Sequence, residues 1–182
     1  MVSDEELLEA ALRGDEGAFA ALYRRRQGAV YRFALHMSGD AAVSEDVTQE
    51  VFIALLESGG RFDPARGTLL SFLYGIARNL LLKRLEKKRP EGPETLADEL
   101  VAEDDVLDDL TRRETIEAVR GAVLSLPAPY REAVVLCDLE NASYEDAAAA
   151  LECPVGTVRS RLSRGRAMLG QKLAVKTARS MS

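Results

Sequence analysis

The clearest chemistry in this chain lies in its last third, where cationic and hydroxyl side chains recur at helical spacing. Thr157, Ser160 and Arg164 fall on one side of a predicted helix, and Arg161 flanks them. The apolar residues of the segment fall on the opposite side: Val155, Val158, Leu162, Gly165 and Leu169. A helix of this kind suits a DNA major groove, because arginine can read a guanine edge through two hydrogen bonds while the other face packs.

The residues before this helix predict a helix-turn-helix. Ser143 is a good N-cap with Asp146 three residues later, and Pro154 suits the first position of the next helix. Arg159 and Arg166 lie at the border of the apolar face, where they are better placed for phosphates. From Cys153 onward there are seven basic residues and no acidic one. An ordinary solvated face mixes both signs, so this bias favours contact with DNA.

A second group of residues could capture an unpaired DNA strand. Phe62, Phe72 and Tyr74 lie around a loop that contains a proline and a glycine. Polar or basic residues follow on the next predicted helix: Arg78, Asn79, Lys83 and Arg84. Unstacked bases bind to aromatic rings, and cations follow the phosphate backbone. Phe72 fits a hydrophobic core equally well. Lys87, Lys88 and Arg89 could bind phosphates or simply form a solvated helix end.

A third group predicts a protein-binding surface on a helix from about Ser44 to Leu56. Its inward positions are Val47, Val51 and Leu55, and the opposite side carries Asp46, Gln49, Glu50 and Ile53. An apolar residue among exposed acids indicates a surface that meets a partner. The alternative is a helix that is buried on all sides of its own domain.

The elements that position these groups are all predicted to be helices. Helical periodicity predicts an all-α fold of two small helical domains, residues 1–89 and 113–182, the second a helix-turn-helix domain. An acidic linker, part of which could be helical, is predicted at residues 90–112, because two prolines open it and nine acids without a base fall between Glu91 and Asp109. The alternative is a surface helix within one domain.

Charge and composition narrow the class of protein. The 182-residue chain has a net charge of −6, but outside Glu91–Asp109 its 24 basic residues exceed the remaining 21 acids. No apolar run is long enough to span a membrane and the N-terminus is acidic, so we expect a cytoplasmic protein without membrane insertion. Cys137 and Cys153 are isolated, and we expect each to be a small buried residue rather than part of a disulfide or zinc site.

Nothing in the sequence predicts an enzyme. His36 is the only histidine, in an apolar helical context where packing or a helix end is the commoner role. There is no phosphate-binding loop, no nucleophile motif and no metal-ligand cluster. We therefore expect no catalytic residue, no metal and no cofactor.

Three segments together resemble the extracytoplasmic-function (ECF) sigma factors of the primary-sigma-type (sigma-70) superfamily. Leu124–Leu169 resembles region 4, Ser44–Glu57 resembles region 2.2, and Phe62–Arg89 resembles regions 2.3 and 2.4. The segments occur in the family's order, and no domain separates the two halves. The resemblance implies a factor that binds core RNA polymerase, recognises and melts promoter DNA and starts transcription.

The resemblance also implies roles for particular residues. The polymerase-binding helix would dock on the clamp of the large subunit through Asp46, Gln49 and Glu50. The loop from about Asp63 to Leu70 would capture a base of the minus-ten element, which Asn79 would help to read. The minus-thirty-five element would be read by Thr157, Arg159, Ser160, Arg161 and Arg164, while Ser163 departs from the larger residues that are common there. An anti-sigma factor is an implied partner.

Two further expectations remain open. The acidic linker could imitate nucleic acid in a basic channel of the polymerase, since in the family it passes near the active-site cleft. The main alternative to a sigma factor is a helix-turn-helix regulator that does not bind polymerase, because this motif occurs in many contexts. Such a regulator would need a dimer surface, and the sequence shows no heptad seam.

Overall fold

The computed structural model describes residues 1–87 and 107–180, with the backbone alone for 107–111, 176, 177, 179 and 180. Within these ranges the chain forms helices and short turns without a β-strand, as the sequence predicts. Most of the predicted linker, together with Lys88 and Arg89, lies outside the described residues. No described helix is both long enough and apolar enough to cross a membrane.

The N-terminal half contains four helices: α1 (Asp4–Leu12), α2 (Glu16–Ser38), α3 (Ala41–Ser58) and α4 (Leu69–Lys87). Side-chain caps set their starts. Ser3 and Glu6 form a reciprocal capping box, and Asp15 accepts a hydrogen bond from the Ala18 amide at 3.0 Å. Asp40 caps α3 in the same way through the Val43 amide, so α3 begins at Ala41, three residues before the predicted start.

The C-terminal half contains α5 (Leu107–Leu124), α6 (Ala128–Val134), α7 (Tyr144–Leu151) and α8 (Val155–Ser180). A π-helical turn at Val135–Leu139 extends α6, and Ser143 caps α7 by accepting a hydrogen bond from the Asp146 amide. Helix α5 begins at Leu107 and therefore inside the predicted linker, residues 90–112. Acidic residues do not prevent helix formation, so a helix that starts within this acidic stretch is consistent with its composition.

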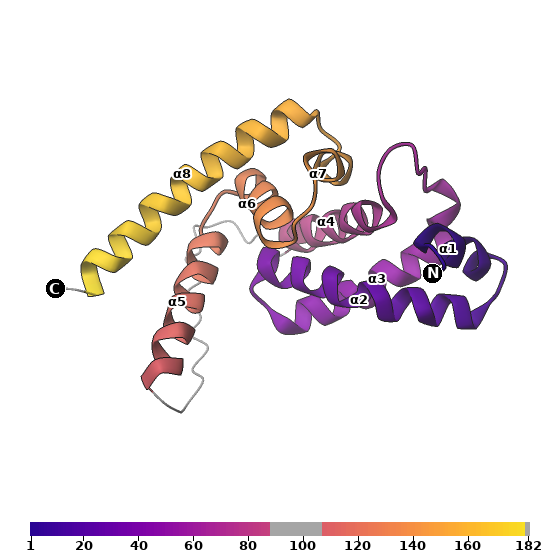
Figure 1. Ribbon diagram of the computed structural model, residues 1–182, viewed down its shortest axis with the longest axis horizontal. Coiled ribbons are helices and arrows are strands. Elements are labelled where there is room, and N and C mark those ends of the chain that lie inside the picture. The colour runs from indigo at the N-terminus through magenta and orange to yellow at the C-terminus, as the bar shows by residue number, and fades with distance from the viewer. Residues whose placement is uncertain (88–106, 181–182) are drawn as a thin grey trace.

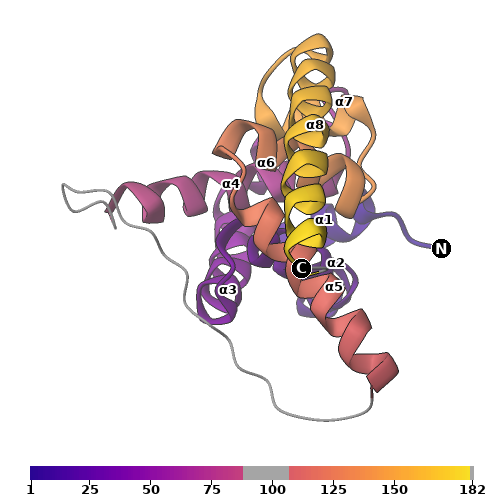
Figure 2. The same cartoon turned by 90° about the vertical axis from the view of Figure 1, so that its left-hand side faces the viewer.

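The two halves pack against each other, with α7 on α4 and α5 on the end of α2 (Figures 1 and 2). One cluster of buried apolar residues continues through both halves, from Phe33 and Leu73 to Ala147 and Val158. The alanines of α7 permit a close approach, as their size predicts. A Cβ on Gly75 of α4 would lie 3.4 Å from the Ala150 carbonyl oxygen. The small residues of α7 therefore allow α4 to pack closely against it.

Candidate nucleic-acid and polymerase interfaces

The apolar side of α8 packs inside the C-terminal half, as predicted. Val158 and Leu162 are fully buried, while Val155 and Leu169 are partly buried. Gly165 allows the closest approach, since a Cβ there would meet Val134 Cγ2 at 2.8 Å and the Tyr130 carbonyl oxygen at 3.1 Å. Burial of this side fixes the rotation of α8 about its axis and leaves the opposite side facing outward.

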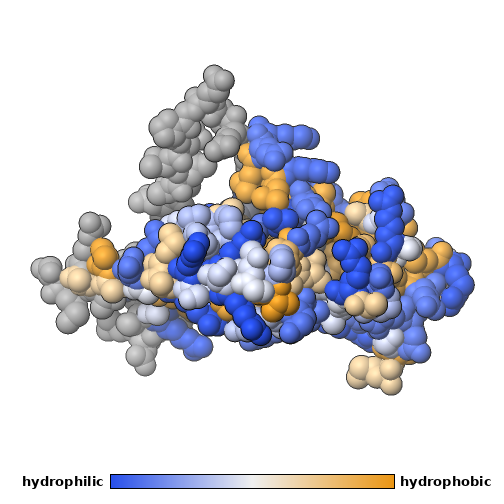
Figure 3. Space-filling model, turned by 90° about the horizontal axis from the view of Figure 1, so that it is seen from above, coloured by the Kyte–Doolittle hydropathy of each residue, from blue (hydrophilic) through white to orange (hydrophobic). Residues whose placement is uncertain are grey.

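The outward side of α8 carries the residues predicted to read the upstream element. Ser160 and Arg164 are exposed, and Thr157 and Arg161 are partly buried. Neither Arg161 nor Arg164 forms an ion pair with any residue that the structure describes. Their guanidinium groups are therefore available to an external partner. The molecular face in Figure 3 is mostly hydrophilic, with its hydrophobic residues in small separate groups.

The two arginines at the border of this side are held by their own domain. Arg166 donates two hydrogen bonds to the Asp138 carboxylate, at 3.0 and 2.6 Å, and these raise the pKa of its guanidinium. Arg159 lies over the Tyr144 ring, 5.5 Å from its centroid. Both side chains remain at the surface, but a phosphate at Arg166 would have to share it with Asp138.

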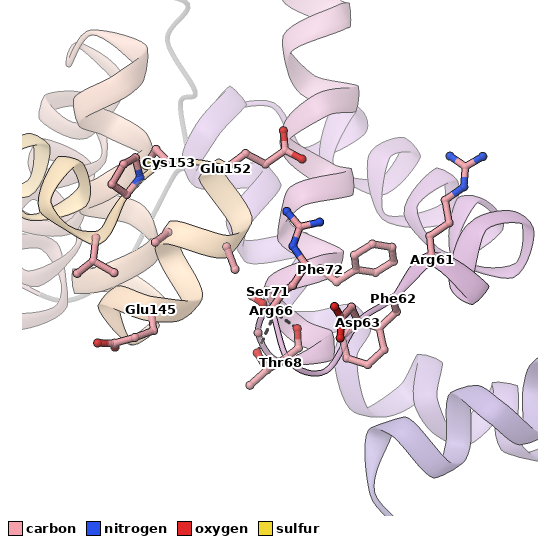
Figure 4. A pocket seen from close by; sticks show the side chains of 15 residues that line it. Arg61, Phe62, Asp63, Arg66, Thr68, Ser71, Phe72, Glu145, Glu152 and Cys153 are labelled. Atoms are coloured by element: carbon pink, nitrogen blue, oxygen red, sulfur yellow. Dashed lines mark hydrogen bonds between the residues drawn. The ribbon is translucent and has the colours of Figure 1, made fainter.

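The loop before α4 has the composition predicted for strand capture, and the structure adds its shape (Figure 4). The rings of Phe62 and Phe72 lie 5.7 Å apart between centroids, and both are partly buried. The Asp63 carboxylate accepts a hydrogen bond from the Ala65 amide at 2.9 Å, which shapes the turn. Tyr74 departs from the prediction: it is buried and belongs to the core, where its ring lies tilted against that of Phe33 with 5.1 Å between centroids.

The polar and basic residues of α4 that are predicted to meet DNA fall into two groups. Asn79 and Lys83 are exposed on the helix. Arg78 instead donates a hydrogen bond at 2.8 Å to Glu132, a residue of α6 in the other half of the chain. Arg84 donates a hydrogen bond at 2.5 Å to Glu50 of α3 and lies 3.9 Å from Asp46. Two residues predicted to meet DNA are thus engaged inside the protein, which helical spacing cannot reveal.

The outer side of α3 is exposed, as predicted for a protein-binding surface. The four predicted residues Asp46, Gln49, Glu50 and Ile53 are all exposed, Ile53 by 57%. Leu56 is also exposed and enlarges the apolar part of this side, whereas Phe52 is buried beside Tyr23. Isolated exposed apolar residues are common, but here two lie one turn apart among carboxylates, a composition suited to a partner surface.

A cavity of about 550 Å³ between the two halves was not foreseen from the sequence. One wall is the loop before α4 with the start of that helix, from Arg61 to Phe72, and the other is formed by α7 and the start of α8 (Figure 4). Thr68, one of its lining residues, joins the two halves by donating from its amide and hydroxyl to Asp146 at 3.1 and 3.0 Å. The walls are about 80 residues apart in sequence, so no local pattern could indicate the cavity.

His36 lies in the setting that the sequence predicts, whereas the two cysteines do not. His36 is in the last turn of α2 and partly buried; burial and the nearby Arg120 and Arg32 lower its pKa. Cys137 and Cys153 are free thiols and only partly buried, so they are less enclosed than predicted. Burial and then the charge of Asp138 raise the pKa of Cys137.

Known proteins resemble this chain along most of its length. Residues 22–91 match the family model of sigma-70 region 2, and residues 116–169 match that of sigma-70 region 4. The RNA polymerase sigma-H factor of Pseudomonas aeruginosa is 34% identical, over 93% of both chains. The ECF RNA polymerase sigma factor SigW of Bacillus subtilis is 33% identical, over 88% of this chain and 91% of its own. SigE of Mycolicibacterium smegmatis is 38% identical, but the match spans only 65% of its length.

Solved structures agree with the arrangement of helices. CnrH, solved in complex with the cytosolic domain of CnrY, superposes with a TM-score of 0.72 at 26% identity, over 94% of this chain and 97% of its own. The sigma factor RpoE of Bartonella quintana, solved with the anti-sigma factor NepR, gives a TM-score of 0.67 at 26% identity, over 86% and 97%. The chain belongs to the sigma-70 family of RNA polymerase sigma factors, in its ECF group.

Proposed function

We propose that this protein binds core RNA polymerase and directs it to promoters, where it recognises and melts DNA to start transcription. The observation that carries the proposal is the division of α8 into a buried apolar side and an outward side, whose two arginines form no ion pair with the described residues. A helix that is rigidly seated by one face can present the other to a major groove in a fixed register. The relatives named above as RNA polymerase sigma factors support the same reading.

The division of labour between the halves follows from their surfaces. Residues 1–89 would bind polymerase and open the minus-ten element, and residues 113–182 would read the minus-thirty-five element. The outward side of α3 would dock on the clamp of the large subunit through Asp46, Gln49, Glu50 and Ile53. Two weak contacts joined in one chain raise each other's effective concentration, which makes the combined recognition specific.

The minus-ten contacts would come from the loop before α4 and from α4 itself. Phe62 and Phe72 offer aromatic faces for an unstacked base, and Asp63 shapes the turn that presents them. Asn79 and Lys83 are exposed for contact with the separated strand. Arg78 and Arg84 belong to the same surface, provided that their present carboxylate partners release them.

The other partners and properties are proposed on coarser grounds. RpoE of Bartonella quintana is described in complex with an anti-sigma factor, and a partner of that class fits this chain as well. The protein would act in the cytoplasm, as a non-catalytic factor without a cofactor of its own, because the proposed chemistry is recognition and the polymerase makes the bonds.

The decisive experiment is transcription in vitro with core polymerase on a library of genomic fragments. We expect specific transcripts that depend on this protein and share upstream sequence elements. A helix-turn-helix regulator that does not bind polymerase would retain DNA binding, but core polymerase would not co-purify with it. Absence of both dependent transcripts and polymerase binding would remove the proposal.

A further inference from the structure

The basic stretch at the end of the chain contains no acid, but the fold supplies one from elsewhere. Asp138, 28 positions before Arg166, lies in the π-helical turn that follows α6. Its two carboxylate oxygens accept hydrogen bonds from Nε and Nη2 of Arg166, at 3.0 and 2.6 Å. One of the seven cations that the sequence offers to DNA is therefore paired with a carboxylate before any DNA arrives.

The geometry of this pair differs from that of an ordinary surface ion pair. Most exposed pairs contribute little, whereas two parallel hydrogen bonds between an arginine and a carboxylate add a fixed orientation to the attraction. The Asp138 side chain is 31% exposed and the Arg166 side chain 53%, so both stay within reach of a partner. A phosphate can therefore approach Arg166, but it meets a cation whose charge is already balanced.

The backbone of the π-helical turn sets the position of Asp138. The Glu140 amide donates a hydrogen bond to the Val135 carbonyl oxygen at 2.9 Å, the wide spacing that defines such a turn. Val135 and Leu136 are fully buried, so packing fixes the inward side of the turn. These turns are rare and occur often at functional sites. The Asp138 carboxylate is therefore held beside α8 by helical backbone rather than by a loop.

Arg159, about two turns earlier at the same border of α8, is held in a different way. Its guanidinium lies over the Tyr144 ring, 5.5 Å from the centroid, and it forms no ion pair with the described residues. An aromatic ring orients a cation without cancelling its charge. The two border arginines are thus a matched pair, in which only Arg166 is neutralised.

The charge on each of these arginines governs how α8 binds DNA of any sequence. Each phosphate that a cation neutralises releases counterions, and this term supplies nearly all of the sequence-independent affinity. In a non-specific complex the helix can shift until every free cation meets a phosphate. In a specific complex, base contacts by Arg161 and Arg164 fix the register, so a further free arginine gains less. Freeing Arg166 would therefore strengthen non-specific binding more than specific binding.

We propose that Asp138 is a specificity-determining residue, which neutralises Arg166 and so limits the attraction of α8 for DNA of arbitrary sequence. The inference rests on the proposed function and adds how its DNA-binding surface discriminates. A protein that must find few sites among many depends on the ratio of its specific to its non-specific affinity. Asp138 lowers the non-specific affinity and leaves the base-reading side of α8 unchanged, so it raises this ratio.

Asp138→Asn tests this role, because the amide keeps the size of the side chain and removes its charge. Fluorescence anisotropy with the full-length protein and a labelled duplex of arbitrary sequence measures affinity over a series of salt concentrations. We expect binding to tighten about five- to ten-fold at about 0.1 M salt, and the salt dependence to steepen by about 0.9, the value of one further phosphate contact. An unchanged affinity and salt dependence would overturn the proposal.

Two controls assign the gain to Arg166. In an Arg166→Ala background, Asp138→Asn should give no gain, because no guanidinium is freed. Glu145→Gln removes one charge from an exposed acid of α7 that forms no ion pair with the described residues. It should change the affinity by less than about two-fold, since salt screens an exposed charge. A gain that persists without Arg166, or an equal gain from Glu145→Gln, would overturn the proposal in favour of general electrostatics.

Folding of each variant is checked through its helical content by circular dichroism. If Asp138→Asn loses helical content, Asp138→Ser takes its place with the same expected results, because it also removes the charge and keeps a polar side chain. A folded Asp138→Ser protein with wild-type affinity and salt dependence would then overturn the proposal.

A second duplex separates failure of this inference from failure of the proposed function. The upstream element of a promoter found in the transcription experiment should gain less affinity from Asp138→Asn than the arbitrary duplex does. Equal gains for both duplexes would overturn the role in specificity. If the library yields no dependent promoter, the proposed function fails and the role in specificity with it, while the arbitrary duplex still decides whether Asp138 restrains Arg166.

Discussion

At the scale of single residues, two arginines in the same basic stretch of α8 have different surroundings. Arg164 is exposed and forms no ion pair with the described residues, whereas Arg166, two positions later, is held by Asp138 through two hydrogen bonds. The difference arises because a step of two residues turns the side chain by about 200° around the helix axis, towards the π-helical turn that carries Asp138.

Arg164→Ala should weaken binding to the upstream promoter element by about 1–3 kcal/mol, the usual contribution of an arginine that reads a base through two hydrogen bonds. Fluorescence anisotropy with a labelled upstream duplex measures the loss. Arg166→Ala is the matched control, and we expect a smaller effect because Asp138 competes for that guanidinium. Unchanged affinity after Arg164→Ala would remove this side of α8 from the groove.

His36 should make folding stability depend on pH in one direction. Its pKa in the folded protein is lowered from 6.5 by burial and by Arg120 and Arg32, so folding favours the neutral ring. The neutral ring's contribution is fully present above pH 6.5 and is lost as the pH falls through 6.5 towards the folded value.

The comparison of wild type with His36→Asn isolates this contribution. We expect the free energy of unfolding of the wild type, relative to that of His36→Asn, to fall between pH 7.5 and pH 5.5. Urea denaturation of both proteins measures this difference. A difference that is constant over this range would mean that the ring is not held neutral.

At the scale of elements, α8 shows how one helix serves packing and recognition together. Its buried side approaches α6 so closely that Gly165 has no room for a Cβ, while Gly170, five residues later, has open space around it. Replacing glycine by a larger residue should therefore have opposite effects on stability at these two positions of α8.

Gly165→Ala should destabilise the protein by about 1 kcal/mol, because the added methyl group overlaps Val134 and approaches the Tyr130 backbone, which outweighs the gain in helix propensity. Gly170→Ala should stabilise it by about 0.5–1 kcal/mol, since only the propensity changes. Urea denaturation of both variants measures the contrast. Equal stabilisation by both would show that α8 does not pack on α6 as described.

Helix α3 likewise uses one side for packing and the opposite side for the proposed contact with polymerase. Asp46→Arg should weaken binding to core polymerase at least ten-fold, because a cation replaces an exposed carboxylate in the proposed interface, while binding of the upstream duplex by α8 survives. Co-purification with core polymerase measures polymerase binding, and fluorescence anisotropy measures binding of the upstream duplex. Glu45→Arg, at the exposed neighbouring position, is the control, and an equal loss in both variants would indicate general electrostatics rather than a docking surface.

At the scale of the whole molecule, the contact between the halves has the greatest bearing on function. A core that runs through both halves and the hydrogen bonds that Glu132 and Asp146 accept across their contact define one closed arrangement. The outward sides of α3 and α8 remain exposed in it, while part of α4 faces α6 and α7. The closed form therefore leaves the polymerase-binding surface accessible and restricts the surface proposed for the minus-ten element.

The sequence by itself determined the helices and their sides. Apolar spacing predicted which side of α3 and α8 is buried, and the Ser143 cap marked the start of α7, because both effects act within a few residues of chain. The resemblance to ECF sigma factors, identified from three ordered segments, was confirmed by the family matches.

Only the tertiary structure decided which charged groups meet. Arg78 and Glu132 are 54 positions apart, and nothing local to either indicates the other; the same holds for Tyr74, which looked available for stacking and lies in the core. The structure also decided where in the acidic segment α5 begins, at Leu107, which composition alone could not locate. Spacing along a helix shows which residues share a side, but the partner of that side depends on how distant segments pack.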